Sequence, residues 1–246
     1  MKQNSVSVIV PTFNESGGIV GLIEAIAKNI PPDREYEIVV VDDNSPDGTF
    51  DLVRTRFASD PHVVAMRRTV DRGLGKSIRA GLEAARGEFV VVMDSDFTHD
   101  PVEIPRLLHV GQIYDIVSGS RFCAGGRMID TRHYLASLAY NWLLRLLIHT
   151  QVQDNLGGYY TARRQALLAL PLDEIFFGYG DYYFRLLHFA QHAGLSIVEI
   201  PAHYLMRVEG QSKSNWLKMF VSYSSGAIRL KMRISRLARA RNRQSA

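Results

Sequence analysis

Two aspartates separated by one residue, Asp94 and Asp96, stand directly after the apolar run 89–93. Hard divalent cations such as Mg²⁺ and Mn²⁺ prefer carboxylate oxygens and complete their coordination with water and substrate phosphates. Because Asp-x-Asp pairs are common in proteins, the informative feature is the place of this pair at the end of a predicted strand. The pair predicts a cation site that receives a phosphorylated substrate. His99 lies close enough in sequence to add a ligand, whereas Asp100, which precedes a proline, is typical of a helix N-cap.

A second acidic cluster follows the apolar run 38–41 and reads Asp42-Asp43-Asn44-Ser45-Pro46-Asp47-Gly48. Turn chemistry explains Asp47 and Gly48, which suit the closure of a turn and the start of the next helix. It leaves two further carboxylates, Asp42 and Asp43, at the strand end. One of them could accept the N–H groups of a nucleotide base.

The segment Arg72-Gly73-Leu74-Gly75-Lys76-Ser77 is similar in outline to a phosphate-binding loop. Such a loop needs a glycine five residues before Gly75, and Val70 stands there, which excludes that motif. A helix that begins near Gly75 would still point its positively polarised N-terminus at a diphosphate. We therefore expect Arg72 and Lys76 to lie near the diphosphate of a nucleotide.

Short β-branched runs alternate with helical patterns in the N-terminal part of the chain, which predicts strand–helix–strand units and a largely parallel sheet. The expected strands cover residues 5–11, 36–42, 62–66 and 88–94. Successive Val and Ile residues in three of these runs indicate helices on both faces of the sheet. Ligands of such sheets bind beyond the carboxyl ends of the strands. The polar clusters at 12–16, 42–47 and 94–100 all fall there.

The pattern is less regular beyond residue 115. Strands are expected at 115–118 and 195–200, and helices at 134–148, at 181–193 and from residue 215 onward. The stretch 134–148 is too short to span a bilayer. Trp142 within it suits a core helix and a helix in the membrane interface equally, so both alternatives stay open.

The last predicted helix combines an apolar stripe with many cations. Its stripe recurs every three or four residues, at Phe220, Tyr223, Ala227, Leu230, Ile234 and Leu237. The net charge is +4, but nine of the 29 Lys and Arg residues follow Glu209, the last acidic residue, so 20 cations stand against 25 acidic residues before that point. This pattern predicts attachment to an anionic membrane surface. The alternative is a solvated helix whose stripe packs on the body. We expect a catalytic α/β domain over 1–210 and a basic amphipathic helix and tail over 211–246.

Composition limits the remaining classes. A chain of 246 residues with 46% hydrophobic and 22% charged residues is typical of one folded globular domain and excludes disorder of the whole chain. The apolar run 6–10 is too short for a secretory signal, and no uninterrupted apolar run is long enough to span a bilayer. The single cysteine, Cys123, excludes an intramolecular disulfide and agrees with a reducing compartment. We expect a cytoplasmic location, peripheral on the cytoplasmic face of a membrane.

Three ordered motifs resemble family-two glycosyltransferases with the GT-A fold. They are VIVPTFNE at 8–15, VDDNSPDGT at 41–49 and MDSD at 93–96. Within that family, SGSR at 118–121 and RVEGQSK at 207–213 are similar to dolichol-phosphate mannosyltransferases and their bacterial polyprenyl-phosphate relatives. The resemblance covers roughly residues 5–215. It implies a mostly parallel central sheet flanked by helices.

Matched residue by residue, the resemblance implies a donor site. The residues around the nucleoside would be Pro11, Phe13, Glu15 and Asp43. Asp94 and Asp96 would hold Mg²⁺ or Mn²⁺ on the donor diphosphate, and Asp96 would be catalytic.

The resemblance also implies an acceptor site. The cradle for the phosphate of a polyisoprenyl lipid would be Arg121, Arg132, Arg207 and Lys213. Arginine suits a phosphate because its planar fork donates two hydrogen bonds at once. Any of the four could instead form an ordinary surface ion pair. Asp154 matches an acidic position that would face the sugar or the reaction centre.

Several departures bear on the sugar and on the third metal ligand. Relatives with a third metal-binding side chain have Gln two residues after the second Asp, where this chain has Thr98. The segment 155–160 lacks the Ser and Phe expected after Asp154, and 178–181 differs from mannosyltransferases. These segments should help to shape the acceptor and sugar pocket.

The resemblance implies an inverting transfer of a hexose, mannose from GDP-mannose, onto dolichyl or undecaprenyl phosphate. The acceptor phosphate has its second pKa near about 6 and needs no general base, so we expect none of the eight histidines to be indispensable. One alternative is a transferase that uses a UDP-sugar, glucose or N-acetylhexosamine, on the same lipid class. A sugar nucleotidyltransferase and a non-enzymatic basic adaptor for membranes or nucleic acid are more distant alternatives. We expect no nucleic-acid partner, and a membrane-embedded partner subunit stays open.

Overall fold

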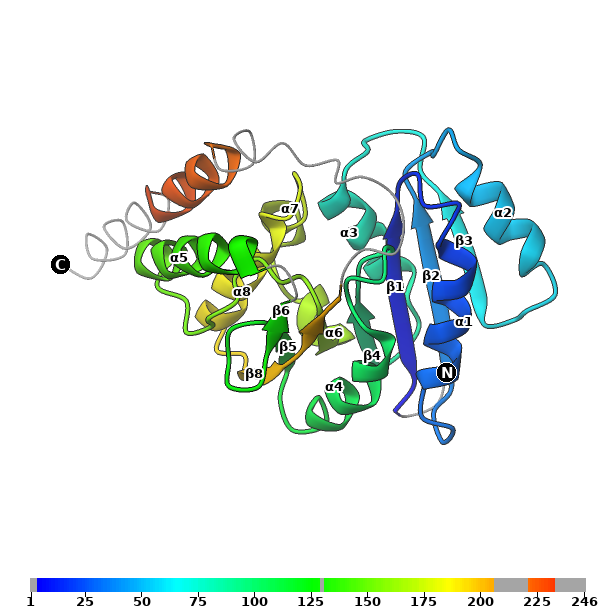
Figure 1. Cartoon of the computed structure of the whole chain (residues 1–246), viewed down its shortest axis with the longest axis horizontal. Coiled ribbons are helices and arrows are strands. Elements are labelled where there is room, and N and C mark those ends of the chain that lie inside the picture. Colours follow the sequence, from blue (N-terminus) through cyan, green and yellow to red (C-terminus); the bar gives the residue numbers. More distant parts are fainter. Residues whose placement is uncertain (1–3, 129–130, 206–220, 233–246) are drawn as a thin grey trace.

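The computed structural model describes residues 4–128, 131–205 and 221–232, except for the side chains of 131–133. At its centre lies a seven-stranded sheet with the order β3-β2-β1-β4-β7-β5-β8 (Figure 1). The strands are β1 (Val6–Thr12), β2 (Tyr36–Asp42), β3 (Val63–Arg67), β4 (Phe89–Val92), β5 (Ile116–Ser120), β7 (Tyr160–Arg163) and β8 (Ile197–Pro201). All of them run parallel except β7, which is antiparallel to both of its neighbours. The predicted α/β fold with a mostly parallel sheet is confirmed.

Helices cover both faces of the sheet, as the apolar runs predicted. One face packs against α1 (Ile19–Asn29), α2 (Thr49–Arg56) and α4 (Ile104–Val110). The other face packs against α3 (Leu74–Ala84), α6 (Arg164–Leu168), α7 (Leu172–Ile175) and α8 (Tyr182–His192). Successive strand residues alternate between the two cores, since Val8 and Val10 of β1 point to the first and Ile9 to the second. A strand buried on both sides has apolar residues facing both cores, which explains the unbroken Val and Ile runs. Its buried polar residues are paired, as Ser7 is with Glu37 (2.7 Å).

The six predicted strands are all present, and no end is shifted by more than two residues. The range 36–42 is reproduced without change. The predicted strand 88–94 is shorter in the structure, because β4 ends at Val92 and Asp94 already lies in the following loop. The predicted helices 134–148 and 181–193 are also present, and of the helix predicted from residue 215 onward the described residues 221–232 are helical. α5 (Thr131–Ile148) begins before residue 134, and α8 covers most of 181–193.

The sequence patterns did not predict β7, nor the two-stranded sheet of β6 (Arg127–Met128) and β9 (His203–Tyr204). β7 has four residues and enters the sheet between β4 and β5, which are distant from it in sequence. Its strand conformation is therefore stabilised by tertiary pairing rather than by a local pattern.

The helical residues 221–232 lie along α5 (Figure 1). Their buried side chains Tyr223, Ala227 and Leu230 form an apolar cluster with Leu144 and Ile148 of α5 and with Phe184 of α8. For this part of the stripe the packing alternative holds. Phe220, Ile234 and Leu237 of the predicted stripe and the predicted domain boundary at 210/211 lie outside the described residues. Within 4–128, 131–205 and 221–232, no helix is both long and apolar enough to cross a membrane.

Candidate active site

The carboxyl ends of β1, β2 and β4 meet at one edge of the sheet, so the loops that follow them adjoin. The loops after β1 and β2 are joined by hydrogen bonds. Asn14 N donates to Ser45 Oγ (2.9 Å), Glu15 N to Thr49 Oγ1 (3.0 Å) and Ser16 N to Asp47 Oδ2 (3.0 Å). The sequence prediction that Asp47 closes the turn agrees with these bonds. They hold the backbone of 14–16 in place beside the second acidic cluster.

The two carboxylates at the end of β2 have different partners. Asp42 is fully buried and accepts hydrogen bonds from Thr12 Oγ1 (3.1 Å) and Ser45 N (2.9 Å), so it stabilises the loop. Asp43 Oδ1 accepts from Arg68 Nη1 (2.7 Å), and its Oδ2 accepts from Gly73 N (2.6 Å). Asp43 therefore fixes the segment that leads into α3.

Phe13 and Arg72 lie side by side, because the Arg72 guanidinium stands 5.0 Å from the centre of the Phe13 ring. Phe13 is 39% exposed as a residue, and its ring can offer a flat apolar surface to a base. Lys76, in the first turn of α3, forms an ion pair with Asp71 (2.7 Å). Pro11 is a buried residue of β1, opposite Val41. The structure thus brings the predicted nucleoside and diphosphate residues to one region.

The Asp94-Ser95-Asp96 motif lies in the loop after β4, at the same edge of the sheet. The Asp94 side chain is 46% exposed, whereas Asp96 is buried and accepts from Thr98 N (3.0 Å) and Thr98 Oγ1 (2.6 Å). Thr98, which stands where relatives with a third metal-binding side chain have Gln, therefore orients Asp96. Asp100 caps the short helix η1 (Pro101–Glu103) by accepting from Val102 N (3.0 Å), as the N-cap interpretation predicted.

Two carboxylates fit a Mg²⁺ or Mn²⁺ ion that takes its remaining ligands from substrate phosphates and water. In the part of the chain that the structure describes, no group of three or more His, Cys, Asp and Glu residues could enclose a metal by itself. His99 is not placed as a third ligand, because its Nδ1 accepts the backbone N–H of Asp94 (2.9 Å) and its Nε2 faces Gly157 O (3.2 Å). A cation held by Asp94 and Asp96 would therefore have coordination positions left for the oxygens of a substrate phosphate.

Arg121, which follows β5, and Asp154 form a buried bidentate ion pair. Arg121 Nε donates to Asp154 Oδ2 (2.8 Å) and Nη2 to Oδ1 (2.7 Å), and the backbone N–H of Arg121 also donates to Oδ2 (3.0 Å). Burial opposes the charged guanidinium, but Asp154 outweighs burial and holds the pKa of Arg121 above its ordinary value. The carboxylate of Asp154 has no exposed surface. Its predicted contact with the sugar stays a prediction, and in this arrangement Asp154 orients Arg121.

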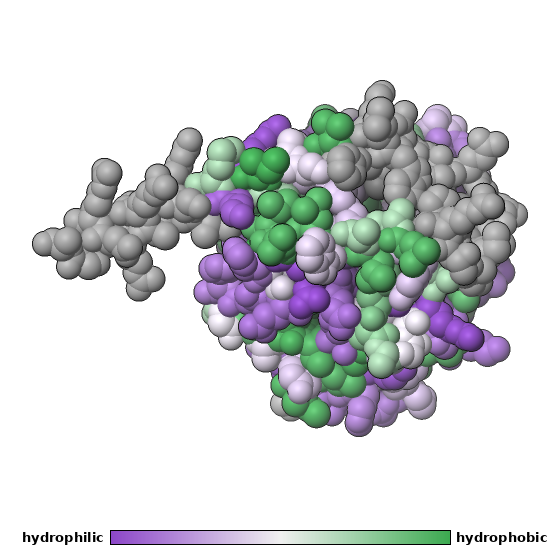
Figure 2. Space-filling view, turned by 60° about the vertical axis from the view of Figure 1, so that its left-hand side comes forward, coloured by the Kyte–Doolittle hydropathy of each residue, from purple (hydrophilic) through white to green (hydrophobic). Residues whose placement is uncertain are grey.

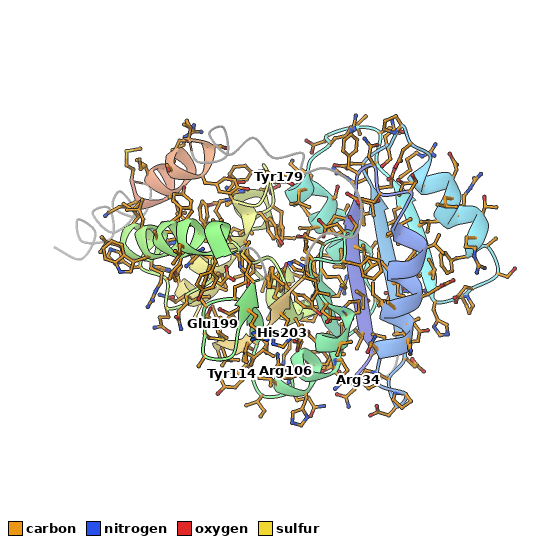
Figure 3. The ribbon with its side chains drawn as sticks, in the orientation of Figure 1. Arg34, Arg106, Tyr114, Tyr179, Glu199 and His203 are labelled. Atoms are coloured by element: carbon orange, nitrogen blue, oxygen red, sulfur yellow. The ribbon has the colours of Figure 1, made fainter. Side chains whose placement is uncertain are left out.

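The backbone that carries Asp154 is fixed by β8. Glu199, labelled in Figure 3, accepts the N–H groups of Gln153 (2.7 Å) and Asp154 (2.9 Å). The Arg121 guanidinium also lies 4.9 Å from the centre of the Tyr204 ring of β9. Of the other predicted acceptor residues, Arg207 and Lys213 lie outside the described residues, as does the side chain of Arg132.

Sequence reasoning did not find Arg68, Glu199 or Tyr204. Each of them acts on a predicted residue from a distant part of the chain, 25 residues away for Arg68 and Asp43 and 45 for Glu199 and Asp154. No motif spacing could have indicated such pairs.

Residues 7–170 match the family described as Glycosyl transferase family 2. The chain belongs to this family. The predicted family and the predicted glycosyltransferase activity are thus confirmed, and the chain is a glycosyltransferase.

Curated relatives of this glycosyltransferase are named for a more specific reaction than the family as a whole. It is 37% identical over 217 residues to the undecaprenyl-phosphate mannosyltransferase of Micrococcus luteus, covering 85% of this chain and 86% of the relative. It is 34% identical over 213 residues to the polyprenol monophosphomannose synthase of Mycolicibacterium smegmatis, covering 84% and 79%. It is 31% identical over 213 residues to the dolichol-phosphate mannosyltransferase of Pyrococcus furiosus, covering 85% and 58%.

Solved structures show the same fold. Glucosyl-3-phosphoglycerate synthase from Mycobacterium tuberculosis, in complex with Mn²⁺, UDP and phosphoglyceric acid, is 24% identical with a TM-score of 0.65, covering 91% of this chain and 76% of that one. The complex of this enzyme with Mg²⁺ and UDP is 25% identical with a TM-score of 0.62, covering 91% and 76%. Both of these structures contain a divalent cation and a nucleoside diphosphate.

Proposed function

We propose that this glycosyltransferase moves mannose from GDP-mannose to a polyisoprenyl phosphate, with inversion at the anomeric carbon. The observation that carries the proposal is the identity of 31% to 37%, over most of the chain, with three enzymes named for polyprenyl-phosphate mannose transfer. The geometry of the site supports it, because a half-exposed Asp94 adjoins the loops that hold Phe13 and Asp43.

On the donor side, Phe13 offers its exposed ring to the base, and Asp43 and Glu15 belong to the adjoining loops after β2 and β1. Arg72 and the N-terminus of α3 face the diphosphate. Asp94 and Asp96 would hold Mg²⁺ or Mn²⁺, which supplies positive charge to the leaving nucleoside diphosphate. Asp96 is preorganised for this role by its two hydrogen bonds from Thr98.

On the acceptor side, Arg121 binds the lipid phosphate together with Arg132, Arg207 and Lys213. Asp154 keeps the Arg121 side chain in one orientation, so little side-chain freedom is lost when a phosphate binds. One phosphate oxygen then attacks the anomeric carbon from the face opposite the leaving diphosphate. At neutral pH most of an alkyl phosphate is dianionic, because its second pKa is about 6, so the step needs no general base.

A membrane surface fits the exposed apolar residues at one end of the molecule. On α5 they are Leu135, Leu138, Trp142 and Leu146, and on the helical residues 221–232 they are Val221, Ile228 and Met232. Figure 2 brings this end forward and shows hydrophobic surface interspersed with polar residues. The spacing of three and four residues on α5 places its four on one side of the helix. We include peripheral binding to the cytoplasmic face of a membrane in the proposal. In that case α5 packs on the body by one side and lies in the membrane interface by the other, which combines the two alternatives given for 134–148.

A vesicle experiment tests this part. Trp142→Ser combined with Leu146→Ser should lower sedimentation with anionic phospholipid vesicles without changing the melting temperature, because both side chains are exposed. Val102 is exposed and lies in η1, which packs on α1 and α4, so Val102→Ser provides a control outside α5. Equal sedimentation of both variants and the unchanged protein would exclude the α5 face as the attachment surface.

Transfer itself is tested with two acceptors in one reaction. Radiolabelled GDP-mannose or UDP-glucose is supplied with Mn²⁺ to a mixture of undecaprenyl phosphate in vesicles and water-soluble phosphoglyceric acid, and label is counted in the organic and aqueous products. Label from GDP-mannose in the organic phase is the expected result. Organic label from UDP-glucose would correct the donor, and label in the aqueous phosphoglycerate product would overturn the lipid acceptor.

A further inference from the structure

His99 occupies a buried position between the cation-binding motif and the acceptor side of the site. It is 1% exposed. Its Nδ1 accepts the backbone N–H of Asp94 (2.9 Å), so in the neutral ring the hydrogen is on Nε2, which donates to Gly157 O (3.2 Å). Nε2 also stands 3.6 Å from Asp94 Oδ2. The two nitrogens of one ring thus connect the backbone of Asp94 to the backbone of Gly157.

Two tyrosines hold the ring of His99 in one orientation. Tyr159 stacks on it with ring centres 4.7 Å apart and an angle of 7° between the planes, and Tyr204 packs edge-on at 4.8 Å. The phenol of Tyr159 is itself fixed by donating to Asp100 O (2.8 Å). Because the ring cannot rotate freely, the positions of its two nitrogens are set by packing as well as by hydrogen bonds.

Three segments of the chain meet at His99. The loop 94–99 carries the cation-binding aspartates, and the segment 157–159 follows Asp154. The third segment, β9, forms an isolated bridge between Tyr204 and His99, extended by a hydrogen bond from Leu205 N to Thr98 O (2.9 Å). Tyr204 also donates to Gly119 O (3.3 Å) and lies against Arg121. His99 therefore contacts Asp94 on the donor side and, through Tyr204, is connected to Arg121 on the acceptor side.

We propose that His99 is a positioning residue for the cation site: its Nδ1 fixes the backbone of Asp94, and its Nε2–H ties that backbone to the acceptor-side segment at Gly157. This inference rests on the proposed cation role of Asp94 and Asp96. His99 touches neither substrate nor cation and transfers no proton. Replacing it therefore weakens cation binding and leaves detectable turnover, in agreement with the expectation that no histidine is indispensable.

The two nitrogens can be tested separately because two amide side chains imitate them. In His99→Asn the amide oxygen can take the place of Nδ1 and accept from Asp94 N, whereas in His99→Gln the amide N–H can take the place of Nε2 and donate to Gly157 O. His99→Phe keeps a flat ring for Tyr159 and Tyr204 but removes both hydrogen bonds. The measured quantity is the dissociation constant of Mn²⁺ in the presence of GDP, by calorimetry on protein shown to be folded by circular dichroism.

Loss of a group that orients a metal ligand weakens the metal by about 10- to 100-fold, so His99→Gln and His99→Phe should lose at least about tenfold in Mn²⁺ affinity. His99→Asn should stay much closer to the unchanged protein. The exposed His62, which stacks on Tyr36 and bonds its carbonyl oxygen, provides the control as His62→Asn and should bind Mn²⁺ normally.

Unchanged Mn²⁺ affinity in all three His99 variants would overturn the inference. So would an equal loss in all three, because the bond to Asp94 N would then not be the one that matters. Asp94→Asn separates this failure from a failure of the proposed function. If Asp94→Asn binds Mn²⁺ and GDP as the unchanged protein does, the cation site itself is wrong, whatever the His99 variants show.

Discussion

Removing the charge of Asp154 should destabilise the protein strongly. Asp154→Asn keeps the shape of the side chain but leaves the Arg121 guanidinium buried beside a neutral amide. In the structure that carboxylate accepts three hydrogen bonds from Arg121, at 2.8, 2.7 and 3.0 Å, and neither side chain is more than 10% exposed. Breaking a buried ion pair from one side costs about 3–5 kcal/mol, because the remaining charge loses its partner without gaining water. We expect a loss of that size in the free energy of unfolding.

Urea unfolding followed by circular dichroism measures this loss from the shift of the midpoint at constant slope. The matched control is Glu24→Gln, which breaks the half-exposed pair with Arg56 (3.2 Å) and should cost at most about 1 kcal/mol. The double variant Asp154→Asn with Arg121→Gln removes both charges and should be more stable than the sum of the single losses predicts. Equal small losses in Asp154→Asn and Glu24→Gln, or strict additivity in the double variant, would refute the buried pair.

Three further predictions concern the cation site, pH and packing. Asp96→Ala should lower label transfer by at least about 100-fold while leaving the melting temperature within a few degrees, and a variant with normal transfer would remove Asp96 from the site. Burial, and then the neighbouring His192, lowers the pKa of His188 from 6.5 to about 4. Between pH 6.5 and about 4 the unfolded chain binds a proton at His188 that the folded chain does not bind, so the free energy of unfolding decreases as the pH falls. His188→Gln should make the melting temperature less dependent on pH across that range. Gly75→Ala would place a Cβ 2.8 Å from the backbone N of Phe177, and we expect a loss of about 1–3 kcal/mol in urea unfolding, against no loss if the contact is absent.

The sheet could be predicted from the sequence where burial determines the residue type. The run 36–42 lies between β1 and β3 with helices on both faces, so its positions 38–41 are all Val or Ile and the strand is recognisable without its neighbours. β7 could not be predicted in this way. It has only four residues, among them Thr161 and Arg163, and its place depends on β4 and β5.

The donor side of the site was predictable for a related reason. In a parallel sheet the loops after neighbouring strands share one edge, so motifs after β1, β2 and β4 had to adjoin once the strands were known. The partners of these residues were not predictable. Arg68 at Asp43, Glu199 behind Asp154 and the two tyrosines around His99 follow from chain packing, to which no spacing in the sequence corresponds.

The central claim is that this protein transfers mannose to a polyisoprenyl phosphate with the help of a divalent cation. The most direct measurement is the rate at which label from GDP-mannose enters extractable undecaprenyl phosphate, first with Mn²⁺ and then after addition of chelator. The account predicts label in the lipid that stops on chelation and returns when Mn²⁺ is restored in excess. Donor and cation binding by the folded protein without any label in the lipid, or transfer that continues unchanged in chelator, would contradict it.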